Sequence, residues 1–568
     1  MTTARSLLAL LLVVTLTGCA SSQQAASPPS PSTSDPVAAT DTTQSNASSD
    51  PVAADSAAVA ATASEAATDW FHYDATGAAP GLGTNEAYRT VLANRTPKQT
   101  VTVAIIDSGV DIDHEDLQPV IWANDDEVPG NGVDDDQNGY VDDVHGWNFI
   151  GGPDGQSVEY DTFELTRLYT NLHERFADVD SSEVPPMARD AYARYRRIAA
   201  EFTEKRDEAQ QQYQNVQQAH QVVQVAAQML RDHLQADALT RQAVEGVSSS
   251  NPDVQRARDI LMYFYQQDLT PSDINEYHDY LQQRVEYNYN PDFDPRSIVG
   301  DDYSDKTERV YGNNDVTGPD AEHGTHVAGI VGAARDNGIG IDGVATGVRI
   351  MSIRAVPNGD ERDKDVANAI RYAVDNGADI INMSFGKGYS PYKNVVDAAV
   401  QHADSMGVLM VHAAGNDGAN VDSTASYPTR YYENGGHADL WLGVGASSPD
   451  GGQELAASFS NYGDEKVDVF APGASIYSTV PGNRYDRSSG TSFAAPMVTG
   501  LAALIMAYHP ELSAAQVRQL ILDTATPHGD TQVTIPGGSR MVPFAALSRT
   551  GAIINAHAAL QRAADRAN

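Results

Sequence analysis

The stretch VTVAIIDSGVD, residues 101–111, decides the fold. Residues 101–106 are apolar or β-branched without a break, and Asp107 ends the run. A run so short and so rich in β-branched residues predicts a strand buried on both faces, which is typical of parallel sheets. The strand would therefore carry a carboxylate at its carboxyl end.

Similar runs follow along the chain, with helical stretches between them. The runs span residues 348–356, 379–386, 408–416 and 440–446, and two of the helical stretches span residues 366–378 and 395–407. Strand alternating with helix predicts an α/β domain built on a parallel sheet. Because ligands bind at the carboxyl ends of such strands, we expect the chemistry of the protein there.

Residues 155–300 break this alternation and predict helices instead. Residues 187–235 contain no Gly or Pro, and apolar side chains recur there at a spacing of three to four residues. Further helices are predicted at residues 252–267 and 271–288. We expect an inserted helical hairpin or small bundle, which is either a structural outgrowth or a working part of the protein.

The charge of the chain excludes one class of partner. The 568 residues include 37 basic and 77 acidic side chains, which gives a formal net charge of −40. Such a chain repels nucleic acid at long range, so no nucleic-acid partner is expected. The sequence does not indicate an oligomeric state.

The N-terminus predicts export. A basic residue, an apolar run and small residues are typical of a signal peptide, here at residues 1–18. LTGC, residues 16–19, resembles the lipobox of bacterial lipoproteins, which implies that the only cysteine, Cys19, is lipidated. Residues 19–67 have the composition of a low-complexity tether. The resemblance implies a secreted lipoprotein anchored to the outer membrane of a Gram-negative bacterium.

Three motifs place catalytic residue types at strand ends and helix starts. They are IIDSGVD with Asp107, HGTHVAGIV with His323 and GTSFAAPMVTG with Ser492. A serine hydroxyl needs a base within hydrogen-bond reach, and that base needs a partner that fixes its tautomer. Each residue alone would be a cap or a turn residue. Together, in the order Asp…His…Ser, they predict nucleophilic acyl chemistry.

These motifs resemble the signatures of the subtilases, the subtilisin-like serine peptidases. The resemblance implies an α/β three-layer sandwich with a central, mostly parallel sheet, to which an all-α insertion is added. It implies that Asp107 orients His323, that His323 takes the proton from Ser492, and that peptide bonds of protein or peptide substrates are hydrolysed through an acyl-enzyme. His326, the second histidine of HGTH, is expected to pack in the interior.

Two further segments extend the resemblance. HAAGND implies that Asn416 donates a hydrogen bond to the oxyanion. MSFGKG implies an extended segment that pairs with substrate and lines one wall of the pocket for the residue before the cut, opposite the HAAGND segment. The residues that would line the two walls are Ser384, Phe385, Gly386, Ala413, Ala414 and Gly415.

An acidic loop, GNGVDDDQNGYVDDVHG, follows the first strand at residues 130–146. With Asp134 at position 1 of an EF-hand loop the first half of the pattern fits, but position 12 is His145 instead of Glu. Hard oxygen ligands favour calcium over zinc, so a structural calcium site of another type is predicted. Its expected ligands are Asp134, Asp136, Asn138 and Asp142. The resemblance adds Asp116 as a ligand of a second calcium, with the loop at residues 336–343.

The chain is thus expected to have four parts. They are a signal peptide (1–18), a tether (19–67), a peptidase domain (68–154 and 301–562) and a helical insertion (155–300). The expected activity is that of a serine endopeptidase. Two alternatives remain open. One is an acyl transferase or ligase, in which an amine replaces water. The other is a vestigial peptidase that binds surfaces through its helical insertion.

Overall fold

A computed structural model describes residues 67–567. The predicted signal peptide, the lipidation site Cys19 and nearly all of the predicted tether lie outside the described residues, so these remain predictions.

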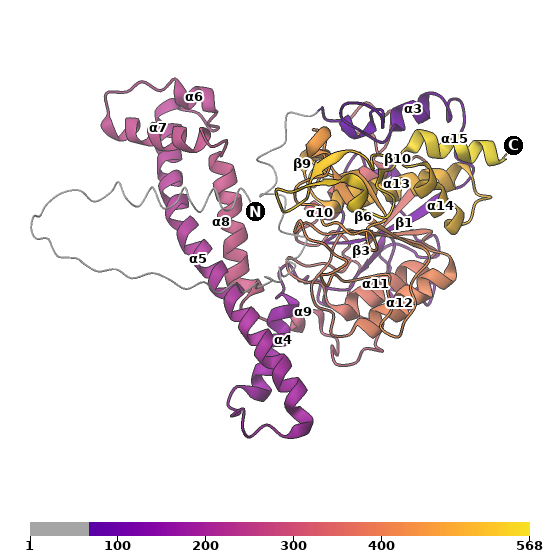
Figure 1. The fold of residues 1–568 in the computed structure, drawn as a ribbon, viewed down its shortest axis with the longest axis horizontal. Helices are drawn as coiled ribbons and strands as arrows, with labels where there is room; N and C mark the ends of the chain where they lie inside the picture. Colours follow the sequence, from indigo (N-terminus) through magenta and orange to yellow (C-terminus); the bar gives the residue numbers. More distant parts are fainter. Residues whose placement is uncertain (1–66, 568) are drawn as a thin grey trace, which may run out of the picture. The chain divides into compact units, whose positions relative to one another are not determined.

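The centre of the structure is a nine-stranded sheet in which all but one of the strand pairs are parallel (Figure 1). The exception is the antiparallel pair at one edge, β10 with β13. The strands in sheet order are β10 (Thr526–Pro527), β13 (Ala552–Ile553), β7 (Val469–Pro472), β6 (Trp441–Ser447), β5 (Leu409–Ala413), β4 (Ile380–Met383), β1 (Val101–Asp107), β3 (Val348–Arg354) and β2 (Gly146–Asn148). The α/β fold with a mostly parallel sheet is therefore confirmed.

Strand β1 is buried on both faces, as its sequence predicts. Val101, Val103 and Ile105 belong to one apolar cluster, whereas Ala104 and Ile106 belong to another. Successive side chains of a strand point to opposite faces, so each cluster covers one face of the sheet. The three layers follow from this alternation.

Helices cover both faces of the sheet (Figure 1). Residues of α10 (Glu322–Gly332), α13 (Thr491–Tyr508), α14 (Ala514–Thr524), α15 (Ala556–Ala567) and α3 (Thr84–Arg89) pack in the first cluster. Residues of α11 (Asp363–Asp375) and α12 (Lys393–Met406) pack in the second. Two short hairpins, β8 (Ile476–Val480) with β9 (Arg484–Ser488) and β11 (Gln532–Thr534) with β12 (Met541–Pro543), complete these elements.

Helix α13 is the central support of the first face. All of its residues are buried, and it contacts strands β1, β3, β4, β5, β6 and β7. It is the one helix among the described residues that is long and apolar enough to cross a membrane, and its complete burial identifies it as a core helix. The helix begins at Thr491, so Ser492 lies in its first turn.

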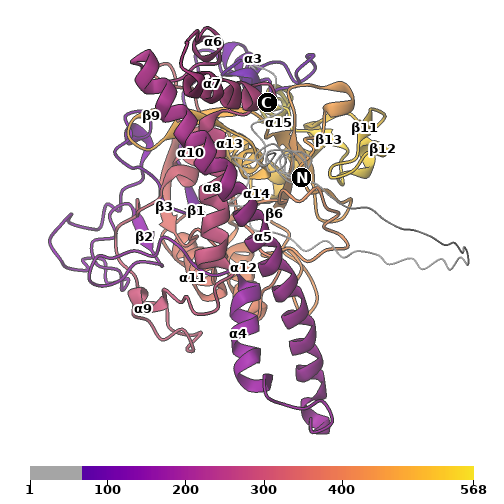
Figure 2. The same ribbon diagram turned by 90° about the vertical axis from the view of Figure 1, so that its left-hand side faces the viewer.

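The predicted insertion is helical. It contains α4 (Glu164–Phe176), α5 (Arg189–Leu234), α6 (Arg241–Glu245), α7 (Pro252–Tyr265), α8 (Pro271–Gln283) and α9 (Arg296–Val299). Figure 2 shows α4 beside the first part of α5, where Tyr169 stacks on Phe202 with ring centroids 4.1 Å apart. α5 is continuous over 46 residues, as the absence of Gly and Pro predicts.

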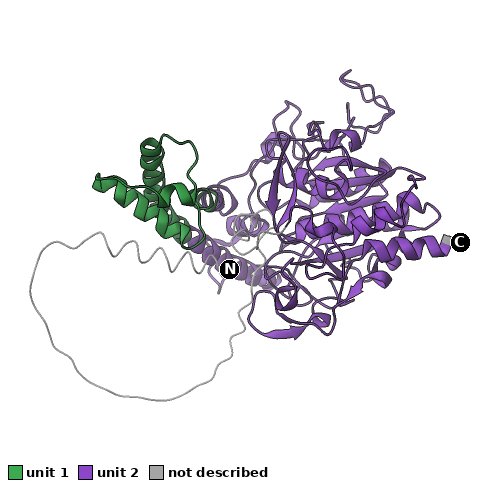
Figure 3. Cartoon of the chain, turned by 90° about the horizontal axis from the view of Figure 1, so that it is seen from above, with its two compact units in different colours: residues 1–48, 211–278 green, residues 49–210, 279–568 purple. Residues whose placement is uncertain are grey.

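The described chain divides into two compact units, which are coloured separately in Figure 3. The smaller unit, residues 211–278, has its own core, in which Val223 and Leu230 of α5 cluster with Leu261 of α7 and Ile274 of α8. The rest of the helical segment belongs to the larger unit, so the division lies inside the predicted 155–300 span. The residues of the candidate active site all belong to the larger unit.

Candidate active site

Asp107 and His323 form a hydrogen-bonded pair. Asp107 is the last residue of β1, and His323 is in the first turn of α10. Asp107 Oδ1 lies 2.7 Å from His323 Nδ1 and also accepts the Ser108 N–H at 2.7 Å. A carboxylate acceptor at Nδ1 places the imidazole proton there and leaves Nε2 as the basic nitrogen.

The environment of His323 tunes it as a base. Burial would lower the pKa of His323, but the charge of Asp107 and its hydrogen bond outweigh burial and raise the pKa above its ordinary value. The second histidine of the motif behaves differently. His326 Nε2 lies near two backbone oxygens, and burial together with the charge of His323 lowers the pKa of His326 to about 3. His326 therefore packs in the interior as a neutral side chain.

Ser492 lies close to this pair. The ring of Phe493, its neighbour in α13, has its centroid 5.4 Å from that of His323. Ser492 Oγ and His323 Nε2 are both buried, and neither has a hydrogen-bond partner among the described residues. No hydrogen bond therefore joins Ser492 Oγ to His323 Nε2 in this structure, and neither atom is engaged by another described residue.

Asn416 is held with its amide nitrogen free. Its Oδ1 accepts hydrogen bonds from Thr491 N at 2.8 Å and Thr491 Oγ1 at 2.9 Å. Thr491 Oγ1 in turn accepts the Gly415 N–H at 3.0 Å. Asn416 Nδ2 is buried and has no partner in the described chain. An unpaired amide donor beside the nucleophile suits a developing oxyanion. The sequence does not single out Thr491, because a Thr before a helix reads as a cap.

The predicted pocket walls follow two adjacent strands. Residues 384–386 come directly after β4, Ala413 ends β5, and the two strands pair. Ser384 Oγ has a structural use, since it donates to Ser492 O at 2.8 Å and accepts from Asn382 Nδ2 at 2.9 Å. Phe385, Ala413 and Ala414 are buried, whereas Gly386 and Gly415 are partly exposed.

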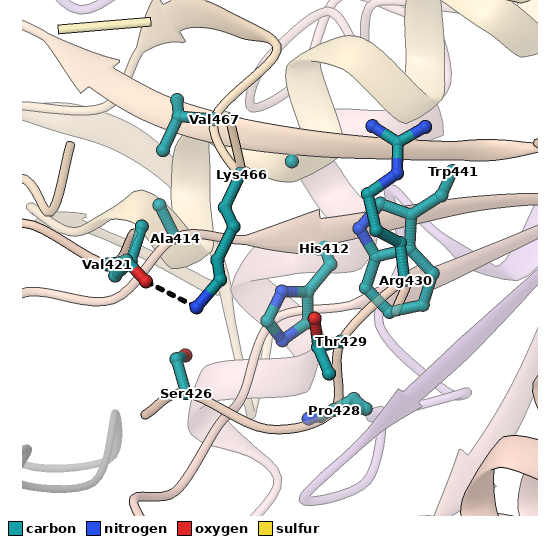
Figure 4. A pocket seen from close by; sticks show the side chains of 11 residues that line it. His412, Ala414, Val421, Ser426, Pro428, Thr429, Arg430, Trp441, Lys466 and Val467 are labelled. Atoms are coloured by element: carbon teal, nitrogen blue, oxygen red, sulfur yellow. Dashed lines mark hydrogen bonds between the residues drawn. The ribbon is translucent and has the colours of Figure 1, made fainter. Parts of the chain in front are cut away.

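Ala414 also lines a cavity (Figure 4). Its lining includes His412, Ser426, Thr429 and Lys466. His412 Nε2 lies 3.0 Å from Phe385 O, and burial lowers the pKa of His412 to about 4. The neutral imidazole therefore donates to this carbonyl and connects the two walls. The sequence gives no signal for this role, because His412 lies inside a buried strand.

The acidic loop brings three carboxylates together, one of which was not predicted. One carboxylate oxygen each from Glu127, Asp134 and Asp136 lie within 4.8 Å of one another. Glu127 is 6% exposed, its Oε1 accepts the N–H groups of Asp135 and Asp136, and its Oε2 has no partner among the described residues. The EF-hand comparison starts at Asp134 and therefore omits Glu127, although an acidic residue shortly before such a loop could have indicated a further ligand.

The other predicted calcium ligands have hydrogen-bonding roles. Asn138 Nδ2 donates to Asp136 Oδ2 at 3.0 Å. Asp142 is outside the group of three carboxylates, and its two oxygens accept the N–H groups of Asn131 and Gly132. Asp116 does reach the 336–343 loop, where Asn337 Nδ2 and the Ile341 N–H donate to it. A metal at Asp116 stays a prediction.

The chain is similar to proteins of a known family. The profile of the subtilase family matches residues 98–539. Subtilisin DY of Bacillus licheniformis is 42% identical over 213 residues, which cover 37% of this chain and 72% of that protein. The thermophilic serine proteinase of Bacillus sp. (strain AK1) is 41% identical over 243 residues, 42% of this chain and 54% of that protein. Subtilisin E of Bacillus subtilis (strain 168) is 40% identical over 215 residues, which cover 37% of this chain and 52% of that protein.

The chain spans about half the length of the last two relatives. Among solved structures, one titled as proteases from Pseudoalteromonas arctica PAMC 21717 is similar with a TM-score of 0.36 and 27% identity, over 44% of this chain and 78% of that chain.

We predict that Asp107→Asn lowers kcat by about 10⁴-fold and moves the acid limb of the pH profile to lower pH. The neutral imidazole of His323 is the active base, so activity is lost as the pH falls through its pKa. Asp107 raises that pKa, and without this charge burial would lower it. The measurement is kcat/KM against pH. The exposed neighbour Asp113 supplies the control, Asp113→Asn, which should leave the profile unchanged. An unshifted acid limb in Asp107→Asn would contradict the assignment.

Proposed function

The chain belongs to the subtilase family, and we propose that it is a serine endopeptidase that works through an acyl-enzyme on Ser492. One observation carries the proposal. Asp107 binds His323 Nδ1 at 2.7 Å, while His323 Nε2 and Ser492 Oγ are buried without partners among the described residues. Two parts of an activated nucleophile are thus present, an oriented base and an unengaged hydroxyl, and the proposal adds that they hydrogen-bond when substrate is bound.

The groups of the site supply each proton transfer. His323 Nε2 takes the proton of Ser492 Oγ as the oxygen attacks the substrate carbonyl. Asn416 Nδ2 donates to the resulting oxyanion, and Asp107 stabilises the imidazolium. The imidazolium then protonates the leaving amine, which breaks the peptide bond and leaves an ester on Ser492. Water, deprotonated by His323, then attacks this ester, and the imidazolium returns the proton to Ser492 Oγ as the acid product leaves.

We predict that Ser492→Ala abolishes peptide hydrolysis and labelling by a fluorophosphonate probe, because both need the Ser492 oxygen. The control is Ser489→Ala, which removes a buried hydroxyl that accepts the Ser475 N–H, three residues before the nucleophile. It should keep both activities. Labelling retained in Ser492→Ala would contradict the proposal.

The same assay separates the alternative functions. Product masses larger than those of hydrolysis, with an added amine, would favour the transferase or ligase. Intact Ser492 without label or turnover would favour a vestigial peptidase.

We also propose that Glu127, Asp134 and Asp136 hold a structural calcium ion. Three carboxylates within 4.8 Å repel one another unless a cation or protons neutralise them. Glu127 Oε2 is buried and has no partner in the described chain, which independently suits a ligand position. Oxygen ligands from a flexible loop match the preferences of calcium.

The calcium would act at a junction of the fold. The loop continues into β2, and Asp143 Oδ2 accepts the Tyr372 hydroxyl of α11 at 2.6 Å. Binding to the folded state alone stabilises it by about 2.7 kcal/mol at a hundredfold excess over Kd.

We predict that calcium raises the melting temperature of the wild-type protein, and that Glu127→Gln removes most of this increase. The adjacent exposed acid gives a matched control, Asp126→Asn, with the same change of charge. Differential scanning calorimetry with calcium or with a chelator measures the shift. An equal calcium shift in Glu127→Gln and in the wild type would refute the ligand set.

We further propose that Cys19 carries the lipid that anchors the protein to a membrane, with protein or peptide substrates outside the cytoplasm. The only cysteine of the chain directly follows an apolar run and a Thr-Gly pair, which supports this role.

We predict that Cys19→Ser moves the protein from the membrane fraction to the soluble fraction, because a lipidated cysteine is needed to hold it there. Quantitative immunoblotting of the two fractions measures this, and Ser21→Ala is the control. Unchanged membrane association of Cys19→Ser would refute lipidation.

A further inference from the structure

Two chain segments leave the sheet on either side of the catalytic aspartate. β1, which ends at Asp107, lies between β3 and β4. Residues 355–363 follow β3, and residues 384–389 follow β4. Because the three strands are parallel, both segments start at the edge of the sheet that carries the active site.

The segment after β4 presents unused backbone groups. The N–H and C=O groups of Gly386 make no hydrogen bond with any described residue and Gly386 is partly exposed, whereas residues 359–363 of the other segment are buried. Free backbone groups on an extended segment bind an extended peptide readily. Ser384, two residues before Gly386, donates its hydroxyl to Ser492 O, so a substrate paired with Gly386 would run from Ser384 toward Lys387.

The space between the segments is closed at Lys387. Its Nζ donates to Glu361 O at 2.6 Å and pairs with Asp363 Oδ1 at 2.8 Å. The side chain of Lys387 is 2% exposed. One ammonium group therefore joins the segment that follows β4 to the segment that follows β3.

The first turn of α4 completes this closure. Glu164 Oε2 lies 3.1 Å from Lys387 Nζ, and the Glu164 N–H donates to Asp360 Oδ2 at 2.7 Å. Arg167 pairs with Glu164 at 2.7 Å and donates to Asp360 O at 3.1 Å. The start of the helical segment thus contacts both flanking segments at one point.

The closure is built from buried charges. The side chains of Glu164, Arg167, Asp363 and Lys387 are between 2% and 9% exposed. Removing any one of them leaves its counter-charge buried and unpaired, so the cluster resists opening. The contacts form a fixed wall, and no mobile lid is needed.

Apolar packing continues the wall beyond Lys387. Tyr389 packs against an apolar cluster that includes Phe163, the residue before α4, and Phe202 of α5. Its hydroxyl donates to Glu201 Oε2 at 2.6 Å. Helices of the inserted segment therefore cover the chain where the substrate-binding segment ends.

We infer that α4 and Lys387 form the end wall of the substrate cleft on the side of the residues that precede the cut. The inference rests on the proposed peptidase function. Ser384 and Lys387 are three residues apart, so an extended substrate paired along this segment has room for about three residues before it meets the wall. On this side of the scissile bond the peptidase therefore recognises only the three substrate residues before the cut. A substrate that is longer on this side must turn out of the cleft at the wall.

The inference is tested by measuring kcat/KM of the wild-type protein for peptide p-nitroanilides that carry two, three, four or five residues before the scissile bond. Adding the third residue should raise kcat/KM about tenfold, because its binding energy is used in the transition state. Adding the fourth and fifth should change kcat/KM by less than about twofold. An increase of about tenfold at the fourth residue would overturn the end wall. Absence of turnover together with absence of fluorophosphonate labelling would refute the peptidase function itself.

A second experiment removes the ion pair between Lys387 and Glu164 that closes the wall. In Lys387→Ala combined with Glu164→Gln, the fourth residue should now raise kcat/KM by at least about fivefold. Tyr389→Phe is the control, because it removes the hydrogen bond to Glu201 but leaves the charge cluster intact, and its length profile should stay flat. Probe labelling counts the folded sites in each variant. A fully labelled double variant with a flat profile would overturn the inference, and if that variant does not fold, the wild-type series decides alone.

Discussion

The hydrogen bond between Asp107 and His323 joins residues 216 positions apart, and the proposed catalytic site depends on it. Asp107 is fixed because β1 is buried on both faces and paired on both sides. His323 is fixed because α10 packs against β1 and α13. The intervening chain can leave the sheet after β2 and return at α10 without moving either residue. This explains how a long helical segment is accommodated between two members of one site.

Besides the Asp107–His323 pair, the protein contains a second group of buried charges, around Lys387. Around Lys387 the chain keeps a cluster of ion pairs where apolar residues would fill the same space at lower desolvation cost. Such pairs demand specific geometry, and here they join α4 to the two segments beside the active site. In this account the helical segment is part of the cleft. Its inner part, in the larger unit, limits what the cleft can hold, whereas residues 211–278 form a unit with their own core.

The sequence predicts the parts of this structure that depend on local pattern. The apolar runs locate the central strands, and the placement of Asp107, His323 and Ser492 at strand ends and helix starts predicts a triad. Interactions between distant segments carry no such pattern. Thr491 reads as a helix cap but orients Asn416, and His412 reads as a strand residue but holds Phe385 O. Glu127 joins the acidic loop through folding of the chain, so spacing rules for calcium loops omit it.

Pre-steady-state kinetics with a p-nitrophenyl ester test the central claim most directly, because an acyl-enzyme accumulates when its hydrolysis is slow. The account predicts a rapid release of p-nitrophenolate equal to one equivalent of active protein. It also predicts that, after acid quenching, mass spectrometry finds the acyl group on Ser492. Turnover without a burst, or an acyl group on another residue, would contradict it.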